Sequence, residues 1–92
     1  MYAVFILEEA HEDLISIVAH VSLDNPAAAQ KLGSELLDLV HTLESMPYRG
    51  SSVKKLPTLR KLIHGNYLIY YRIKDAESLV EIVSFVHGAQ IR

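Results

Sequence analysis

The side chains best suited to chemistry lie in the second half of the chain, and most of them are cations. They are Lys54, Lys55, Arg60, Tyr70, Arg72 and His87. Arginines can stabilise the negative charge that builds up in a phosphoryl-transfer transition state, and a histidine can move a proton. The same cations can instead bind phosphates or carboxylates on a recognition surface. Both chemistries stay open at this point.

Two sets of candidate residues follow from these alternatives. For an enzyme, the candidate catalytic residues are Arg60, Arg72 and His87. For a binding protein, the candidate partner-binding surface is Lys54, Lys55, Arg60, Tyr70 and Arg72. A histidine near the end of a strand is more often structural than catalytic, which favours the binding surface.

Other chemistries lack the residues that they need. The chain has no cysteine, which excludes disulfides, thiol catalysis and thiolate zinc sites. His11 and His20 are nine residues apart, and metal-binding pairs on one helical face are four apart. The serines lack the strand–turn–helix setting of a hydrolase nucleophile. We therefore expect no metal and no cofactor.

Charge is segregated along the chain, although the net charge is only −2. Residues 1–48 contain eight acids and one base, a net charge of −7, whereas residues 49–74 contain seven bases and no acid, a net charge of +7. Residues 75–92 add −2. Such a basic segment either attracts an acidic partner or complements the acidic helices within the fold.

The stretch Leu56–Ile73 must position Arg60, Lys61 and Arg72. Two apolar runs flank a His64-Gly65-Asn66 turn, which predicts a β-hairpin with arms at 59–63 and 67–73. Alternation along the second arm places Tyr70 and Arg72 on an open face. The side chains expected to pack on the helices are Tyr67, Ile69, Tyr71 and Ile73. A further strand, Leu79–His87, is expected to alternate strictly between its two faces.

The first half of the chain predicts two helices. Acids from Glu8 onwards open the first helix, where they oppose its dipole, and apolar residues recur at spacings of three and four up to Val21. Asn25-Pro26 is a strong start signal for the second helix, whose apolar stripe continues to Met46. So short a connection predicts an antiparallel helical hairpin.

The remaining segments complete the expected fold. Tyr2–Leu7 predicts a buried strand, and Tyr48–Thr58 predicts a mobile basic loop. The order is β-α-α-β-β-β, a single α+β domain over residues 1–92 in which the helical hairpin covers one face of an antiparallel sheet. The apolar runs are far shorter than the ~20 residues of a membrane span, and no signal peptide is visible. We expect a soluble cytoplasmic protein that does not bind membranes.

Several short motifs together carry a family resemblance. They are Ala10 through Ile17 with its acidic pair, Asn25-Pro26-x-Ala28-Ala29, Pro47-x-x-Gly50, Leu59-Arg60, Gly65 through Arg72, and Val86-His87-Gly88-Ala89. With these motifs the sequence resembles the RelE/ParE superfamily of small toxins from bacterial toxin–antitoxin pairs. The resemblance implies the fold expected above and a cognate antitoxin that wraps and neutralises the toxin. A homodimer and a toxin–antitoxin hetero-oligomer both stay open.

The superfamily divides by mechanism. RelE-like members cleave messenger RNA on the ribosome with basic residues, commonly helped by a histidine or a C-terminal tyrosine, whereas ParE-like members inhibit DNA gyrase. Arg72 matches an arginine found in both groups. The His87-Gly88-Ala89 ending is at least as typical of ParE-like chains, Gln90 stands where an arginine is frequent, and no C-terminal tyrosine follows.

Charge favours the same branch. A ribosome-dependent nuclease must approach a dense polyanion, and a pI of about 6.2 is unfavourable for that task. We therefore expect a ParE-like gyrase inhibitor, more plausibly a binding protein than an enzyme. One alternative is a RelE-like endoribonuclease that acts on the ribosome and mRNA through Arg60, Arg72, His87 and the Lys54/Lys55 loop. The other is an inactive member that only binds its antitoxin.

Overall fold

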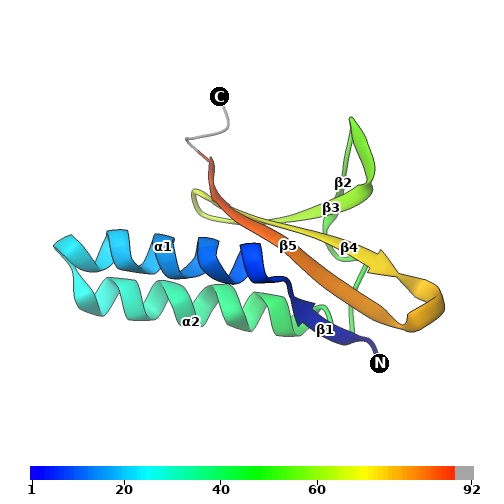
Figure 1. The fold of residues 1–92 in the computed structure, drawn as a ribbon, viewed down its shortest axis with the longest axis horizontal. Helices are drawn as coiled ribbons and strands as arrows, with labels where there is room; N and C mark the ends of the chain where they lie inside the picture. The colour runs from blue at the N-terminus through cyan, green and yellow to red at the C-terminus, as the bar shows by residue number, and fades with distance from the viewer. Residues whose placement is uncertain (89–92) are drawn as a thin grey trace.

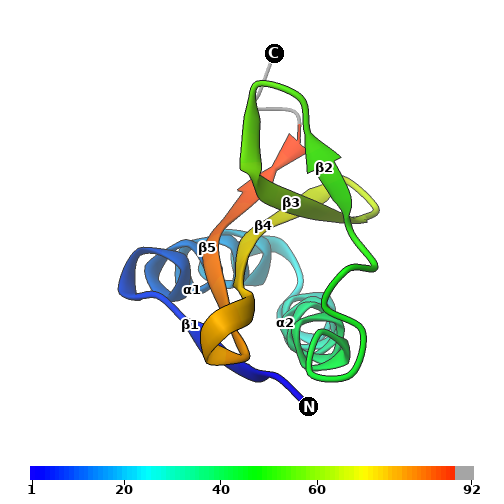
Figure 2. The same ribbon diagram turned by 90° about the vertical axis from the view of Figure 1, so that its right-hand side faces the viewer.

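A computed structural model describes residues 1–88, which form a layer of two antiparallel helices under a twisted sheet (Figures 1 and 2). The helices are α1 (Glu8–Asp24) and α2 (Pro26–Thr42). The strands are β1 (Ala3–Ile6), β2 (Ser51–Val53), β3 (Leu56–His64), β4 (Tyr67–Lys74) and β5 (Leu79–His87), with a 3-10 turn η1 (Asp75–Glu77) between β4 and β5. The expected α+β fold with the order β-α-α-β-β-β is confirmed, with one short strand added.

Asn25 separates the two helices in the expected way. Its side chain accepts a hydrogen bond from the Ala28 amide at 3.0 Å, and Pro26 occupies the first turn of α2. The far end of α2 differs from the prediction, because the helix ends at Thr42 and not at Met46. The amides of Leu43 and Glu44 donate to carbonyls three residues back, which tightens the last turn and ends the helix.

The strand order in the sheet is β1-β5-β4-β3-β2. β1 pairs with β5 in parallel, so the expectation of a purely antiparallel sheet is wrong for this pair. Only strands joined by a tight hairpin are forced to be antiparallel, and β1 is separated from β5 by most of the chain. β1 is also an edge strand and is not buried as expected, because the Phe5 side chain is 57% exposed.

The predicted loop at Tyr48–Thr58 is partly a β-ribbon. β2 pairs with an early part of β3, with Ser52 opposite Arg60, and Lys54 and Lys55 form the turn between them. β2 has three residues, two of which are serines, so hydrophobic alternation could not reveal it. The expectation of an irregular segment was therefore wrong for this ribbon.

A β-bulge interrupts β5. Tyr70 lies opposite Ser84 and Tyr71 opposite Ile82, so Val83 has no partner on β4. The expected strict alternation is therefore wrong beyond this point. The extra residue places Phe85 on the same face as Ile82, and both are buried against the helices.

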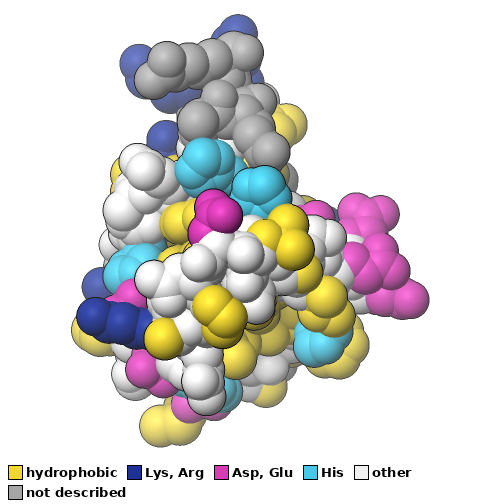
Figure 3. Space-filling view, turned by 90° about the vertical axis from the view of Figure 1, so that its left-hand side faces the viewer, with side chains coloured by type: hydrophobic (Ala, Val, Ile, Leu, Met, Phe, Trp, Pro, Cys, Tyr) yellow, Lys and Arg dark blue, Asp and Glu magenta, His cyan; other side chains and the backbone are white. Residues whose placement is uncertain are grey.

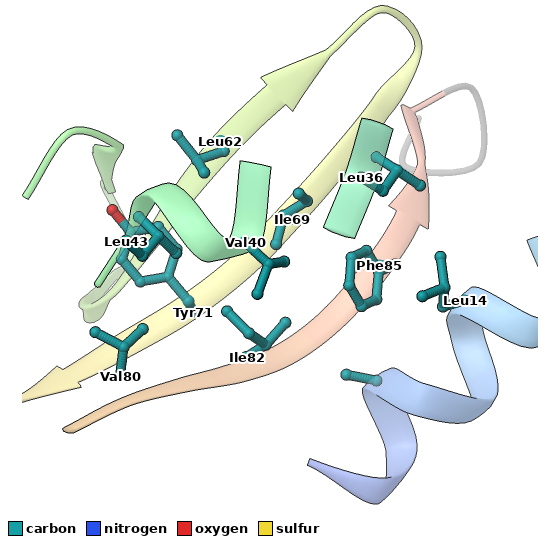
Figure 4. Packing of buried hydrophobic residues seen from close by; sticks show 11 residues of the cluster. Leu14, Leu36, Val40, Leu43, Leu62, Ile69, Tyr71, Val80, Ile82 and Phe85 are labelled. Atoms are coloured by element: carbon teal, nitrogen blue, oxygen red, sulfur yellow. The ribbon is translucent and has the colours of Figure 1, made fainter. Parts of the chain in front are cut away.

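The core lies between the helices and the sheet (Figure 4). Its buried members are Ala10, Leu14, Leu36, Val40, Leu43, Leu62, Ile69, Tyr71, Val80, Ile82 and Phe85. Tyr67 and Ile73 pack against this cluster, so the face predicted for β4 is confirmed. Among residues 1–88, neither helix has the length and apolar character needed to cross a membrane.

Candidate functional site

The face of the sheet turned away from the helices carries two of the five predicted partner-binding residues, Tyr70 and Arg72. We call it the open face. Strand pairing places two rows of side chains across it: Lys61, Tyr70 and Ser84 in one row, and Ile63, Leu68 and Val86 in the other. Ile63 is 65% exposed, which is unusual for a large apolar side chain in a strand. The open face therefore combines exposed apolar surface with cations.

Arg72 lies on the open face as predicted. Its Nε donates to Oε1 of Glu81 on β5 at 2.6 Å, and Nζ of Lys74 lies 3.6 Å from the same oxygen. The hydrogen bond from Arg72 is the main reason that the pKa of Glu81 lies below its ordinary value of 4.5, and Lys74 adds to the effect. Arg72 is thus held by a partner from the same chain.

Arg60 lies on the opposite face of β3, because it stands across from the buried Tyr71. Its Nη2 donates to the carbonyls of Tyr48 and Gly50, at 3.1 and 2.5 Å, and its guanidinium lies 5.2 Å from the centre of the Tyr48 ring. These contacts fasten the segment before β2 to the sheet. Arg60 is therefore tied to backbone carbonyls on the other face from Tyr70, and its assignment to the partner-binding surface stays a prediction.

His87 lies on the helix side of β5. It stands opposite Tyr67, and the centres of the two rings are 5.0 Å apart. Arg72 stands opposite Glu81 and is five positions along β4 from Tyr67, which corresponds to about 17 Å at the rise of a strand. The structure does not bring His87 together with Arg72.

Arg60 and Arg72, by contrast, line one shallow hollow of about 330 Å³ at the edge of the sheet, together with Tyr48, Pro57, Thr58 and Ile73. Lys54 and Lys55 are exposed in the β2–β3 turn. Of the three candidate catalytic residues, two therefore share a hollow and the third, His87, lies elsewhere.

Sequence reasoning missed two polar contacts that join distant parts of the chain. The carboxylate of Asp75 accepts hydrogen bonds from the hydroxyls of Tyr2, at 2.6 Å, and Tyr48. These two hydrogen bonds lower the pKa of Asp75 from its ordinary value of 3.8, and the bond from Tyr2 contributes most. They also raise the pKa values of both tyrosines above the ordinary value of 10.0. No spacing in the sequence indicates a contact between residues so far apart.

The second missed contact joins α1 to the sheet. Oδ2 of Asp13 accepts a hydrogen bond from the Phe85 amide at 3.2 Å, two residues after the bulge. The sequence suggested only that this carboxylate opposes the helix dipole. Among residues 1–88, no group of three or more histidines and carboxylates is arranged to hold a metal ion.

Three solved structures from toxin–antitoxin systems share this architecture. The chain is similar to a chromosomal ParDE system from P. aeruginosa, with a TM-score of 0.81 at 20% identity over 95% of this chain and 96% of that one. It is also similar to the toxin–antitoxin complex RelBE2 from Mycobacterium tuberculosis, with a TM-score of 0.73 at 22% identity over 94% of this chain and 90% of that one. A third similar structure is the isolated E. coli RelE toxin, with a TM-score of 0.64 at 17% identity over 96% of this chain and 85% of that one. At these identities the likeness establishes the fold.

The fold is thus the one that these ParE and RelE structures share. Residues 4–92 match the family model for the ParE toxin of the type II toxin–antitoxin system parDE, so the chain belongs to this family. No curated protein sequence matches the chain significantly. Ala89 and Gln90, which contributed to the ParE-like expectation, lie outside the described residues.

Proposed function

We propose that this toxin inhibits DNA gyrase in the cytoplasm by binding it through the open face of the sheet, and that a cognate antitoxin neutralises it. The observation that supports the proposal most is that His87 lies apart from Arg60 and Arg72. A nuclease needs such groups around one scissile phosphate, within hydrogen-bond reach. In this chain Arg60 holds backbone carbonyls, and His87 lies on the other side of the sheet from Arg72.

The open face suits recognition of a protein. Interfaces combine apolar anchors with a polar rim, and Ile63, Leu68 and Val86 form an apolar row beside Lys61 and Tyr70. Lys54 and Lys55 project from the adjacent turn. The +7 segment falls largely on these strands and attracts an acidic surface of the target.

A supercoiling assay with purified toxin and gyrase tests the proposal. Wild-type toxin should block supercoiling at micromolar concentration, and Ile63→Asp should abolish the block by placing a charge in the apolar row. Leu23→Asp is the matched control, because Leu23 is 83% exposed at the end of α1 and away from the sheet. Unchanged supercoiling with folded wild-type toxin at micromolar concentration would overturn the proposal.

One observation favours the alternative endoribonuclease. Arg60 and Arg72 line the same hollow, and the buried Nε of Arg60 has no hydrogen-bond partner among the described residues. A translation extract should then show cleaved messages with wild-type toxin and intact ones with Arg72→Ala.

An inactive member that only binds antitoxin would leave growth unaffected when it is expressed alone. Intact messages and arrested growth would favour the gyrase proposal over both.

A further inference from the structure

A second hollow, of about 370 Å³, opens on the helix side of the molecule. It lies between α1, the beginning of β4 and the end of β5. From α1 it is lined by Asp13, Ser16, Ile17 and His20. This volume lies in the range of natural ligand sites. Figure 3 shows two histidine side chains next to each other near the top of this side of the molecule, with an acidic side chain directly below them and hydrophobic atoms around. The hollow is distinct from the open face.

The sheet contributes three aromatic walls to this hollow. They are Tyr67 on β4 and Phe85 and His87 on β5. Val83 has no partner on β4, and the residues after it face α1 at Phe85 and His87. The rings of Tyr67 and His87 lie tilted by 47° against each other. Faces and edges of aromatic rings favour planar cations and apolar stems.

Asp13 is fixed at the edge of this aromatic surface. It is half-buried, and its Oδ2 accepts the Phe85 amide hydrogen at 3.2 Å. Oδ1 accepts no hydrogen bond from the described residues and remains available to an incoming donor. The exposed Glu9 and Glu12 lie on the same helix, so the local field also favours a cation.

We infer that this hollow receives one arginine side chain of the antitoxin. The aliphatic stem of an arginine would pack on Ile17 and Phe85, its plane would stack on Tyr67 or His87, and its guanidinium would donate to Oδ1 of Asp13. A lysine would supply the positive charge, but it has no planar group that could stack on Tyr67 or His87. The antitoxin is the occupant because the toxins of this family belong to toxin–antitoxin systems, and the acidic residues of α1 attract a cationic segment. The inference rests on the proposed pairing with an antitoxin and not on gyrase as the target.

The first experiment uses the purified toxin and small probes. Nα-acetyl-arginine methylamide, the lysine analogue and the neutral, isosteric citrulline analogue are titrated separately and followed by NMR. The arginine probe should shift the signals of Ser16, Tyr67 and His87, and the citrulline probe should not. Asp13→Asn should weaken arginine binding at least tenfold, whereas Asp38→Asn, at an exposed acid of α2 outside the hollow, should not. Equal binding of arginine and citrulline, or shifts elsewhere, would overturn the inference.

The second experiment uses the complex with the antitoxin encoded beside the toxin. Asp13→Asn retains an oxygen for the Phe85 amide and should fold, yet it should weaken antitoxin binding by about tenfold, with gyrase inhibition unchanged. Ser16→Arg, which places a cation of the toxin's own in the hollow, should weaken binding as well. Replacing each antitoxin arginine by alanine should identify one whose effect disappears in Asp13→Asn. Undiminished binding by both toxin variants contradicts the inference, whichever target the toxin has.

Discussion

The hydroxyl of Tyr71 accepts a hydrogen bond from the Gly50 amide at 3.0 Å, and it donates one to the Pro47 carbonyl at 2.8 Å. Tyr71 is completely buried in the centre of β4. One side chain of the sheet therefore satisfies two backbone groups of the segment that leads from α2 to β2. This contact gives the Pro47-x-x-Gly50 motif a structural role, because it sets where the second half of the chain enters the sheet.

Loss of that hydroxyl should destabilise the toxin. Tyr71→Phe keeps the ring and leaves the Gly50 amide and the Pro47 carbonyl buried and unpaired, which costs roughly 1–3 kcal/mol. The free energy of unfolding from urea titration measures the effect. Tyr70→Phe is the matched control, because the hydroxyl of Tyr70 lies on the open face and should matter by less than about 0.5 kcal/mol. Equal effects of the two substitutions would contradict this role for Tyr71.

Gly50 should not tolerate a side chain. A Cβ at this position would lie 2.6 Å from both the Lys61 carbonyl oxygen and the Tyr71 hydroxyl. Backbone and a buried ring cannot easily move away, so Gly50→Ala should cost about 1–3 kcal/mol or more. Ser51→Ala, at an exposed neighbouring position, should change the unfolding free energy only slightly. Comparable melting temperatures for the two variants would refute the steric argument.

The Arg72–Glu81 pair should make stability depend on acidity. The folded-state pKa of Glu81 is lowered from 4.5, so its contribution is fully present above that pH and is lost as the pH falls through the folded value. Urea titrations from neutral pH to about pH 3 should show a shallower decline for Glu81→Gln than for the wild type. Glu77→Gln, in η1, serves as the control. A decline of the same slope in Glu81→Gln and the wild type would contradict the pairing.

Asp75 should raise the pH at which Tyr2 and Tyr48 lose their protons. Tyr2 and Tyr48 have raised pKa values because their hydroxyls donate to a carboxylate that would repel a tyrosinate. Their neutral forms stabilise the fold below pH 10.0, and that contribution is lost as the pH rises through the folded values. Tyrosinate absorbance should therefore appear at lower pH in Asp75→Asn than in the wild type. Asp24→Asn, at the end of α1, should titrate as the wild type does.

The parts of the fold that were predictable depend on local patterns. The Asn25-Pro26 cap, the apolar stripes of α1 and α2, and the hairpin around Gly65 are each encoded within a few neighbouring residues. Gly65 takes a φ of 59°, which glycine adopts without strain. The face of β4 that carries Ile69 and Tyr71 was predicted for the same reason, since alternation is a local property.

The parts that were missed depend on pairing between distant residues. The direction of β1 is set by β5, and the pairing of Ser51–Val53 by β3, and neither partner is visible in the local pattern. The side occupied by His87 does not follow from counting residues along β5, because Val83 has no partner on β4 and shifts the alternation after it. Arg60 was predicted as a free cation, because a sequence does not show which carbonyls its guanidinium will meet. The residue types of the candidate site were therefore visible in the sequence, but which of them lie together in the fold was not.

The bulge in β5 also affects how the sequences of related toxins should be aligned. β5 contains one residue more than its partner β4 needs, and that surplus is Val83. Loss of its codon would restore a regular ladder and leave the side chains of Phe85 and His87 facing the helices. A homologous toxin without this residue would carry the equivalents of both one position earlier in its numbering. Sequence alignments of such toxins therefore need a one-residue gap here, or His87 will be matched to a residue from the opposite side of the sheet.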